Sequence, residues 1–357
     1  MEQGDLTEFI SSVSGDKYLR VEEELGGGFV RLKTAEAERR QAKHDIRAVE
    51  DIVIEMLRNA RDAGADAIFV ATTRDGNLRD LTVIDDGSGV PDDMREHIFE
   101  PRVTSKLDSM VVDTWGVHGR GMALFSIRSN ARVARVVESR PGEGSSFVVI
   151  IDGNELSERA DQSTIPALER GDDGEYTVVR GPHNIARTVI EFAAENRHAI
   201  DVYMGSPADI VATMVAYGRR RLTDKELLFC DDPNDLPLCT RLGACTDAAE
   251  LVGTAELLGL GISERTAHRV LGGQVVPQRP LIEQAIRTSQ RGHKSPDIFK
   301  DSRGLSISKE DLDTFTRHLE DAFEDISERY YLNLTKKPKI TVSGDSIHVR
   351  FDIEKDR

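Results

Sequence analysis

The densest cluster of residues suited to ligand chemistry is Asp85-Asp86-Gly87-Ser88-Gly89, which follows an apolar stretch that ends at Ile84. Two glycines two positions apart let a backbone approach a flat ligand closely. A carboxylate at the end of a strand can accept a hydrogen bond from an exocyclic amine. The same residues are also common in ordinary turns. On its own, the cluster is compatible with either a ligand site or a simple turn.

A second glycine-rich cluster runs from Gly116 through Gly119 and Gly121 into the apolar stretch Met122–Ile127. Spaced glycines before a helix can hold phosphate on backbone N–H groups at the helix N-terminus. The chain contains no G-x-x-x-x-G-K-[ST] sequence, so this cluster is not a P-loop. It also does not follow a strand as a dinucleotide-binding G-x-G-x-x-G does.

The elements that must position these clusters form a helix and two hairpins. A stretch from about Ile46 to Ala63 places its apolar residues on one helical stripe, with Glu55 and Asn59 roughly opposite as an i, i+4 pair. Apolar segments 67–71 and 81–84 flank one turn, and 131–138 and 146–151 flank another. A helix packed on antiparallel strands predicts an α+β fold rather than a parallel doubly wound sheet.

Four motifs in chain order resemble the GHKL ATPase superfamily, which includes DNA gyrase, histidine kinases and MutL. They are residues 55–65, the Asp85–Gly89 cluster, Thr104-Ser105-Lys106 and the Gly116–Gly121 cluster. Each motif is weak alone, but the four occur together over residues 45–151 at separations similar to those of the superfamily. The resemblance implies a two-layer α/β sandwich that binds ATP beneath a mobile lid.

The resemblance also implies a role for each matching residue. Asn59 corresponds to the ligand of Mg²⁺, and Asp85 to the residue that reads the adenine amino group. Gly87 and Gly89 correspond to glycines beside the base. Gly116, Gly119 and Gly121 correspond to lid glycines around the phosphates. Mg²⁺ prefers oxygen ligands and keeps several waters, so one amide oxygen plus phosphates can hold it. Lys106 is either a phosphate ligand or a solvated surface lysine.

Glu55 separates two functional branches of the superfamily. Hydrolytic members resemble the E-x-x-x-N pattern here, with the glutamate as the general base for water. The resemblance therefore predicts an ATP-driven conformational switch or dimerising clamp, with DNA processing of the MutL or topoisomerase VI B type as one role. The alternative is a histidine-kinase-like module that phosphorylates a partner protein. Such a kinase would place a separate phosphoacceptor hairpin before this domain, and the sequence shows none.

The chain divides into four predicted zones. Residues 1–45 are a lead-in, 46–205 the ATP-binding domain, 206–300 a mostly helical domain, and 301–357 a long helix with a closing hairpin. Residues 246–271 predict two short helices that loosely resemble a helix–two-turn–helix module. A homodimer formed on ATP binding and a separate partner subunit are the expected partners.

Composition excludes several classes of protein. Lys and Arg number 47 and Asp and Glu 63, which gives a net charge of −16, so an overall basic nucleic-acid-binding surface is excluded. DNA contact would need a local patch and is left open. No apolar run is long enough for a membrane span, and the acidic start lacks a signal-peptide core, so a cytoplasmic protein is expected. The 3 cysteines form no C-x-x-C pair, which disfavours a zinc site.

Overall fold

A computed structural model places the chain in two compact units, residues 1–289 and 290–357. It describes residues 21–26, 28–32, 44–104, 112–113, 116–117, 121–159, 162, 164–171, 176–291, 309–330, 332–343 and 346–355. Among these residues, no helix combines the length and apolar character that crossing a membrane requires. Residues 206–289 share the first unit with the predicted ATP-binding region.

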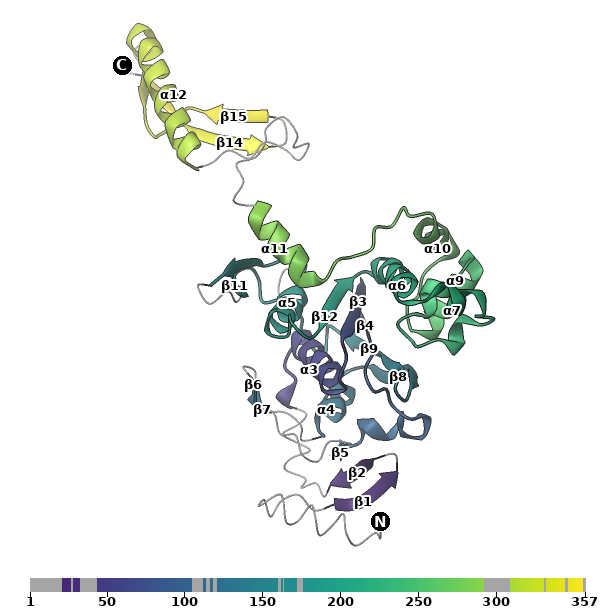
Figure 1. Ribbon diagram of the computed structural model, residues 1–357. Helices are drawn as coiled ribbons and strands as arrows, with labels where there is room; N and C mark the ends of the chain where they lie inside the picture. The colour runs from purple at the N-terminus through teal and green to yellow at the C-terminus, as the bar shows by residue number, and fades with distance from the viewer. Residues whose placement is uncertain are drawn as a thin grey trace. The chain divides into compact units, whose positions relative to one another are not determined.

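A five-stranded sheet in the order β12-β3-β4-β9-β8 forms the centre of the first unit (Figure 1). Its strands are β3 (Ala67–Asp75), β4 (Leu78–Asp85), β8 (Val133–Arg140), β9 (Gly144–Asp152) and β12 (Asp201–Gly205). The two predicted hairpins are confirmed as the antiparallel pairs β3–β4 and β8–β9. The edge strand β12 lies parallel to β3.

Helices α3 (Val49–Asp62), α4 (Ala123–Asn130) and α5 (Ile185–Glu195) belong to the first layer. The predicted stripe of α3 is buried: Val53, Met56 and Leu57 are at most 2% exposed. They share one core with Ile68 and Val83 of the sheet. This packing confirms the predicted α/β sandwich.

A second helical layer covers the opposite face of the sheet (Figure 1). It contains α6 (Pro207–Arg221), α7 (Asp224–Leu228), η3 (Pro233–Asp235), α8 (Arg241–Ala244), α9 (Ala248–Leu257) and α10 (Glu264–Leu271). Phe69 and Tyr203 point into this layer from adjacent strands, with stacked rings 5.0 Å apart between centroids. The sheet is therefore buried on both faces.

Smaller elements complete the first unit. The pair β1 (Val21–Gly26) and β2 (Phe29–Leu32) continues into β5 (Val103–Thr104) as a three-stranded sheet. The remaining elements are η1 (Asp92–Met94), η2 (His97–Phe99), β6 (Val112–Asp113), β7 (Gly116–Val117), β10 (Ala167–Arg170) and β11 (Tyr176–Arg180). Helix α11 (Leu281–Arg291) begins in the core of the first unit, where Leu281 is buried.

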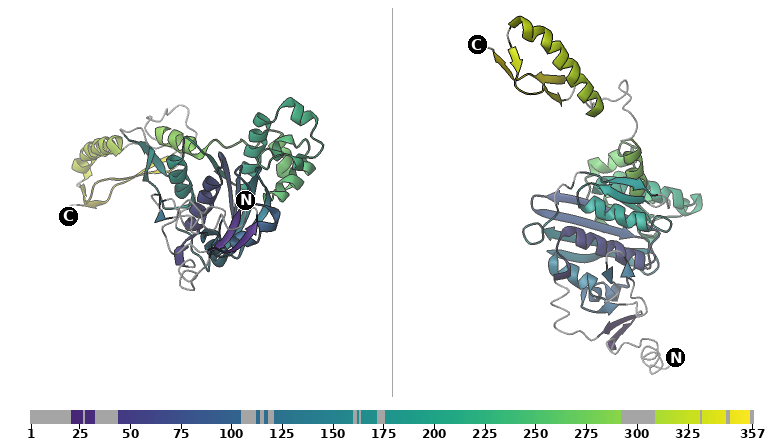
Figure 2. Two further views of the ribbon diagram at one scale, coloured as in Figure 1. Left: turned by 60° about the horizontal axis from the view of Figure 1, so that its bottom comes forward. Right: turned by 90° about the vertical axis from the view of Figure 1, so that its left-hand side faces the viewer.

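The second unit is a long helix with short strands, as predicted for the end of the chain (Figure 2). It contains α12 (Lys309–Tyr330), β13 (Leu332–Leu334), β14 (Lys339–Ser343), β15 (Ser346–Arg350) and β16 (Ile353–Lys355). The hairpin β14–β15 confirms the predicted closing hairpin, although its turn at Gly344 lies outside the described residues. Phe323 of the helix stacks on Phe351.

Candidate functional site

Helix α3 carries Glu55 and Asn59 on the side away from its buried stripe, and both are partly exposed. The helix begins where the Asp51 carboxylate accepts hydrogen bonds from the backbone N–H groups of Arg47 and Ala48. The side chain of Glu55 forms an ion pair with Arg58, whose side chain is 5% exposed. A catalytic role for Glu55 would therefore require its carboxylate to act from within this ion pair or to leave it.

The side-chain amide of Asn59 has an unsatisfied atom. Its nitrogen Nδ2 is buried, and no described residue accepts a hydrogen bond from it. A buried amide without a partner costs about 1–3 kcal/mol, so native proteins keep few of them. The amide can also be turned so that its oxygen takes this place. The amide therefore has hydrogen-bonding capacity that the described residues do not use.

Asp85 ends β4 as a buried carboxylate with only 2% exposure. Its Oδ1 accepts a hydrogen bond from Gly87 N at 2.9 Å, and its Oδ2 accepts one from the Ser145 hydroxyl at 2.6 Å. Two neutral donors thus fix the orientation of the carboxylate. A buried, oriented carboxylate is a costly feature that suits recognition of a hydrogen-bond donor.

Gly87 and Gly89 are required by packing around this carboxylate. A Cβ at Gly87 would lie 2.8 Å from the carbonyl oxygen of Ala63, just beyond the end of α3. Gly89 has φ +66°, and a Cβ there would lie 2.1 Å from the carbonyl oxygen of Arg140. The loop therefore closes tightly against both α3 and the β8–β9 turn. The same packing brings the Asp85 loop next to the helix that carries Asn59.

Three residues of the β8–β9 turn support the site and were not predicted. The Ser145 hydroxyl binds Asp85, and the Ser139 hydroxyl accepts from Val90 N at 2.6 Å. Gly144 has φ +101°, and a Cβ there would lie 2.2 Å from the carbonyl oxygen of Asp85. The available sequence signal is the second glycine of Pro141–Gly144, which by itself predicts only a hairpin turn, with a serine on each side.

Gly116 and Gly121 are the predicted glycines of this cluster that lie within the described residues. Gly121 has φ +65°, and its carbonyl accepts a hydrogen bond from Arg102 N at 2.8 Å, just before α4 begins. Gly116 pairs with Asp113 in the β6–β7 ladder. Lys106 and Gly119 lie outside the described residues.

Arg102 joins the N-terminal strands to Gly121. Its φ of 58° is left-handed, a conformation that costs a residue with a side chain of the order of 1–2 kcal/mol. Its carbonyl accepts from Leu32 N at 3.1 Å, while its N–H binds Gly121. Backbone strain held by surrounding bonds is common at functional segments. Arg102, which precedes the glycine-rich cluster, is thus hydrogen-bonded both to Gly121 at the end of the cluster and to Leu32 of β2.

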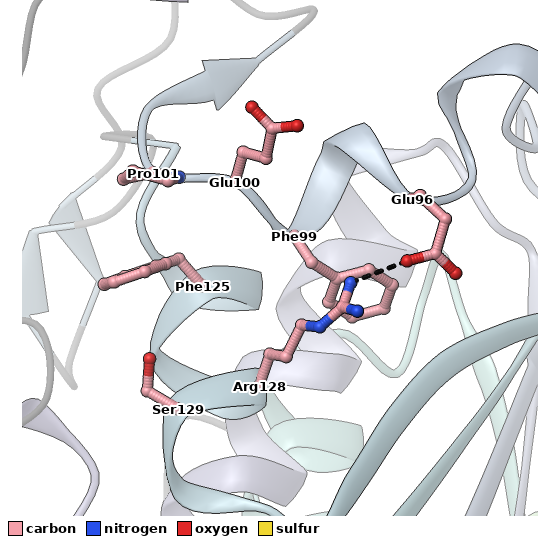
Figure 3. Close-up of a pocket in the computed structure, with 7 residues that line it drawn as sticks. All are labelled: Glu96, Phe99, Glu100, Pro101, Phe125, Arg128 and Ser129. Atoms are coloured by element: carbon pink, nitrogen blue, oxygen red, sulfur yellow. Dashed lines mark hydrogen bonds and ion pairs between the residues drawn. The ribbon is translucent and has the colours of Figure 1, made fainter.

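A hollow of about 420 Å³ is lined by residues of α4 and of the segment 96–101 (Figure 3). Arg128 of α4 crosses it, with an ion pair to Glu96 at 2.9 Å and its guanidinium 5.3 Å from the centre of the Phe99 ring. Its lining includes Glu100 and Pro101 but none of the predicted site residues.

The second helical layer contacts Asp86, the residue next to Asp85, through α6. Asp86 accepts from the Tyr217 hydroxyl of α6 at 3.0 Å and from Ala67 N of β3 at 2.8 Å. Burial and the nearby Asp86 carboxylate raise the pKa of Tyr217 well above its usual range. Asp86 is therefore a structural bridge between the layers, in contrast to its neighbour Asp85.

The predicted hairpin of residues 246–271 forms α9 and α10, with Asp247 and Ser263 as their N-caps. Its turn is bound to the sheet: the carbonyl of Gly259 accepts from the Thr82 hydroxyl at 3.0 Å, and that of Leu258 from the Ser146 hydroxyl at 2.8 Å. This turn therefore faces the protein core.

The three cysteines are free, and no group of three or more His, Cys, Asp or Glu among the described residues is placed to hold a metal. Burial raises the pKa of Cys239 well above its usual range and that of Cys245 to about 11. Both thiols are therefore neutral core residues at ordinary pH.

Comparison with known proteins finds similarity in the part of the chain that contains Glu55, Asn59 and Asp85. A family described as "Histidine kinase-, DNA gyrase B-, and HSP90-like ATPase" matches residues 44–155. DNA mismatch repair protein MutL from Thermus thermophilus is 37% identical over 121 residues, which are 33% of this chain and 21% of that protein. MutL from Brucella anthropi is 38% identical over 121 residues, covering 34% and 18%. The chain thus spans about a fifth of the length of these relatives.

Two solved structures also match, one of them the catalytic domain of a histidine kinase. The catalytic domain of ThkA has 21% identity and a TM-score of 0.22, covering 33% of this chain and 68% of that one. Full-length ShkA in complex with AMPPNP has 17% identity and a TM-score of 0.23, covering 41% and 34%.

Proposed function

We propose that residues 44–155, which belong to the GHKL ATPase superfamily, bind ATP with Mg²⁺ and hydrolyse it. The observation that supports this proposal most is the buried carboxylate of Asp85, held in one orientation by Gly87 and Ser145. In this proposal, Asp85 accepts a hydrogen bond from the adenine amino group. Such a bond to a charged group is worth about 1.5–3 kcal/mol.

The donor set of α3 supports a magnesium role. Asn59 has a buried amide atom with no partner among the described residues. Turned over, its oxygen is a ligand of the type that Mg²⁺ accepts, with phosphates and water completing the shell. The ion would neutralise phosphate charge. Gly121 and the start of α4 would face the phosphates, where a helix N-terminus favours negative charge.

Glu55 is the proposed general base. It lies one turn before Asn59 on the same helix and would orient or deprotonate the attacking water. Arg58 forms an ion pair with this carboxylate. An ion pair of this kind fixes the direction of the carboxylate, although it also competes with water for the same oxygen atoms.

The wider role is proposed from the similarity to MutL. We propose an ATP-driven switch that forms a homodimer when ATP is bound, in DNA processing of the MutL type, since the matching relatives are 37–38% identical in this region. The 206–300 region would then carry the function that distinguishes this chain. The helix–two-turn–helix interpretation has little support as a DNA contact, because the α9–α10 turn binds the sheet.

Steady-state ATP hydrolysis of Glu55→Gln tests the catalytic part. Glutamine can still accept a hydrogen bond from Arg58 but cannot take a proton. We expect near-normal ATP affinity and a turnover lower by roughly 10²–10⁴-fold. In the presence of ATP, this variant should elute as a dimer, because hydrolysis no longer depletes the bound state.

Glu191→Gln is a matched control. Glu191 is 23% exposed and paired with Arg187 on α5, while Glu55 is 22% exposed and paired with Arg58. The control should keep its turnover. Equal turnover of wild type and Glu55→Gln would exclude the general-base role. Transfer of labelled phosphate to a partner protein would favour the kinase alternative. Measurement with and without duplex DNA tests the DNA-processing role.

A further inference from the structure

Two consecutive apolar residues at the end of α7 are largely in solvent. Leu228 is 78% exposed and Phe229 is 72% exposed. Single exposed apolar residues are ordinary on protein surfaces, but adjacent large ones beside a cavity mark interaction sites. Phe229 and Leu236 also line a hollow of about 470 Å³ between α7 and η3.

The rim of this hollow is acidic. Glu226, Asp231, Asp232 and Asp235 line it, against the single cation Lys225. Glu226 accepts from Thr223 N in the capping box of α7, and Asp232 accepts from Asn234 N as the N-cap of η3. Asp231 and Asp235 are exposed and make no side-chain hydrogen bond or ion pair within the described part of the chain. Their charges are therefore available to a ligand.

The negative potential extends into the hollow. Cys230 lies in its wall, and burial together with the carboxylates of Asp232 and Asp235 raises the pKa of its thiol above the usual range. A nucleic acid would meet repulsion here, because its phosphates carry the same sign of charge. Cationic groups would be attracted, and more strongly at low salt.

The side of the hollow that contains Leu236 is linked to the sheet by hydrogen bonds. Arg241 is 1% exposed; its Nε donates to the carbonyl of Leu236 at 2.9 Å, and its Nη1 to Glu138 of β8 at 3.1 Å. A buried guanidinium bonded at two sides holds both partners in place. Leu236 is thus held in place before binding, which lowers the ordering cost on this side of the hollow.

We propose that this hollow docks a cationic segment of a partner protein that inserts an apolar side chain beside Phe229. Phe229 and Leu236 would contact the inserted side chain, and Asp231 with Asp235 would pair with flanking Lys or Arg residues. The charge of the rim selects this occupant over an acidic segment or a nucleic acid. The site is separate from the ATP site and does not depend on nucleotide.

Binding of a fluorescein-labelled peptide, Lys-Leu-Lys-Phe-Lys-Leu, to the full-length protein tests this proposal by anisotropy at 0.15 M salt. Two variants alter the hollow: Phe229→Ser, and Asp231→Asn with Asp235→Asn. Each should weaken binding by about tenfold or more, as removal of a central anchor does. Bound peptide should also slow alkylation of Cys230, which lies in the wall.

Matched variants elsewhere separate this site from general attraction to an acidic protein. Val276→Ser removes a residue that is 73% exposed, similar to Phe229. The double variant Asp75→Asn with Glu155→Gln removes two exposed charges, at the end of β3 and after the end of β9, that are not in the lining of the hollow. These controls should bind the peptide as the wild type does. Equal losses in controls and hollow variants, no loss in any variant, or unchanged alkylation of Cys230 would overturn the proposal.

Discussion

At the scale of single residues, the sequence identified Asp85 and its glycines but not the residues that hold them. A carboxylate followed by spaced glycines is a local pattern, visible over five positions. Ser145 lies 60 positions later and reaches Asp85 only because β4 and β9 pair in register. Such contacts depend on the pairing of strands, which the local pattern does not define. Strand register therefore limited the prediction of this site.

Gly89 is expected to be essential to the fold as well as to any ligand site. Gly89→Ala places a Cβ against the carbonyl of Arg140, and we expect a loss of unfolding free energy of about 3 kcal/mol or more. Gly142→Ala is the matched control: its φ is +77°, yet no atom lies within 4 Å of a Cβ there. It should cost only about 1–2 kcal/mol, the strain of a left-handed alanine. Urea unfolding of both variants measures the difference, and equal losses would contradict the packing explanation.

At the scale of elements, α3 and the two hairpins could be predicted because their patterns are local. The cover on the second face of the sheet was not predicted. Residues 67–71 read Ala-Ile-Phe-Val-Ala, a continuous apolar run that is typical of a strand buried on both faces. That signal was present, but nothing local indicates which helices supply the cover. Phe69 meets Tyr217 of α6, about 150 positions away.

The second helical layer should make the fold sensitive to alkaline pH. Burial raises the pKa of Cys245 to about 11 and that of Tyr203 to about 12. Both groups are acids whose folded pKa exceeds the unfolded one. Their stabilisation is present below about pH 9 and is lost as pH rises towards the folded values. These two groups alone should lower the unfolding free energy by the order of 2 kcal/mol between pH 8 and 10.5, and the raised pKa values of Cys239 and Tyr217 add to this decrease.

Urea unfolding at the two pH values checks this expectation, and Tyr203→Phe is the control. Phenylalanine keeps the stacking on Phe69 but cannot ionise, so the variant should show a smaller decrease. The same slope in wild type and variant would exclude Tyr203 as a source of the pH dependence.

At the scale of the whole molecule, the chain consists of two compact units, and the hydrophobic core clusters of the described residues lie in the first. The first contains residues 44–155, which are similar to the ATPase family, and the second contains α12 with its short strands. A ligand that binds one unit stabilises that unit by mass action. We therefore expect nucleotide to raise the thermal stability of the first unit and to leave that of the second unchanged.

Scanning calorimetry of the full chain should show two transitions, and Mg·ATP should raise only the one belonging to residues 1–289. At an ATP concentration 100 times the dissociation constant, the gain is about 2.7 kcal/mol. Mg·GTP is the control, because its base lacks the amino group that Asp85 would recognise. A shift of both transitions by ATP, or an equal shift by GTP, would contradict this division.

The most direct test of ATP recognition is calorimetric titration of ATP, with Mg²⁺ present, into the wild type and Asp85→Asn. Asparagine can still accept from Gly87 N and meet the Ser145 hydroxyl, so the loop should keep its structure, which circular dichroism and urea unfolding verify. The adenine amino group, however, loses its charged acceptor. We predict a dissociation constant higher by roughly 10–150-fold. Equal affinity of a folded Asp85→Asn protein, or no ATP binding by the wild type, would contradict the account.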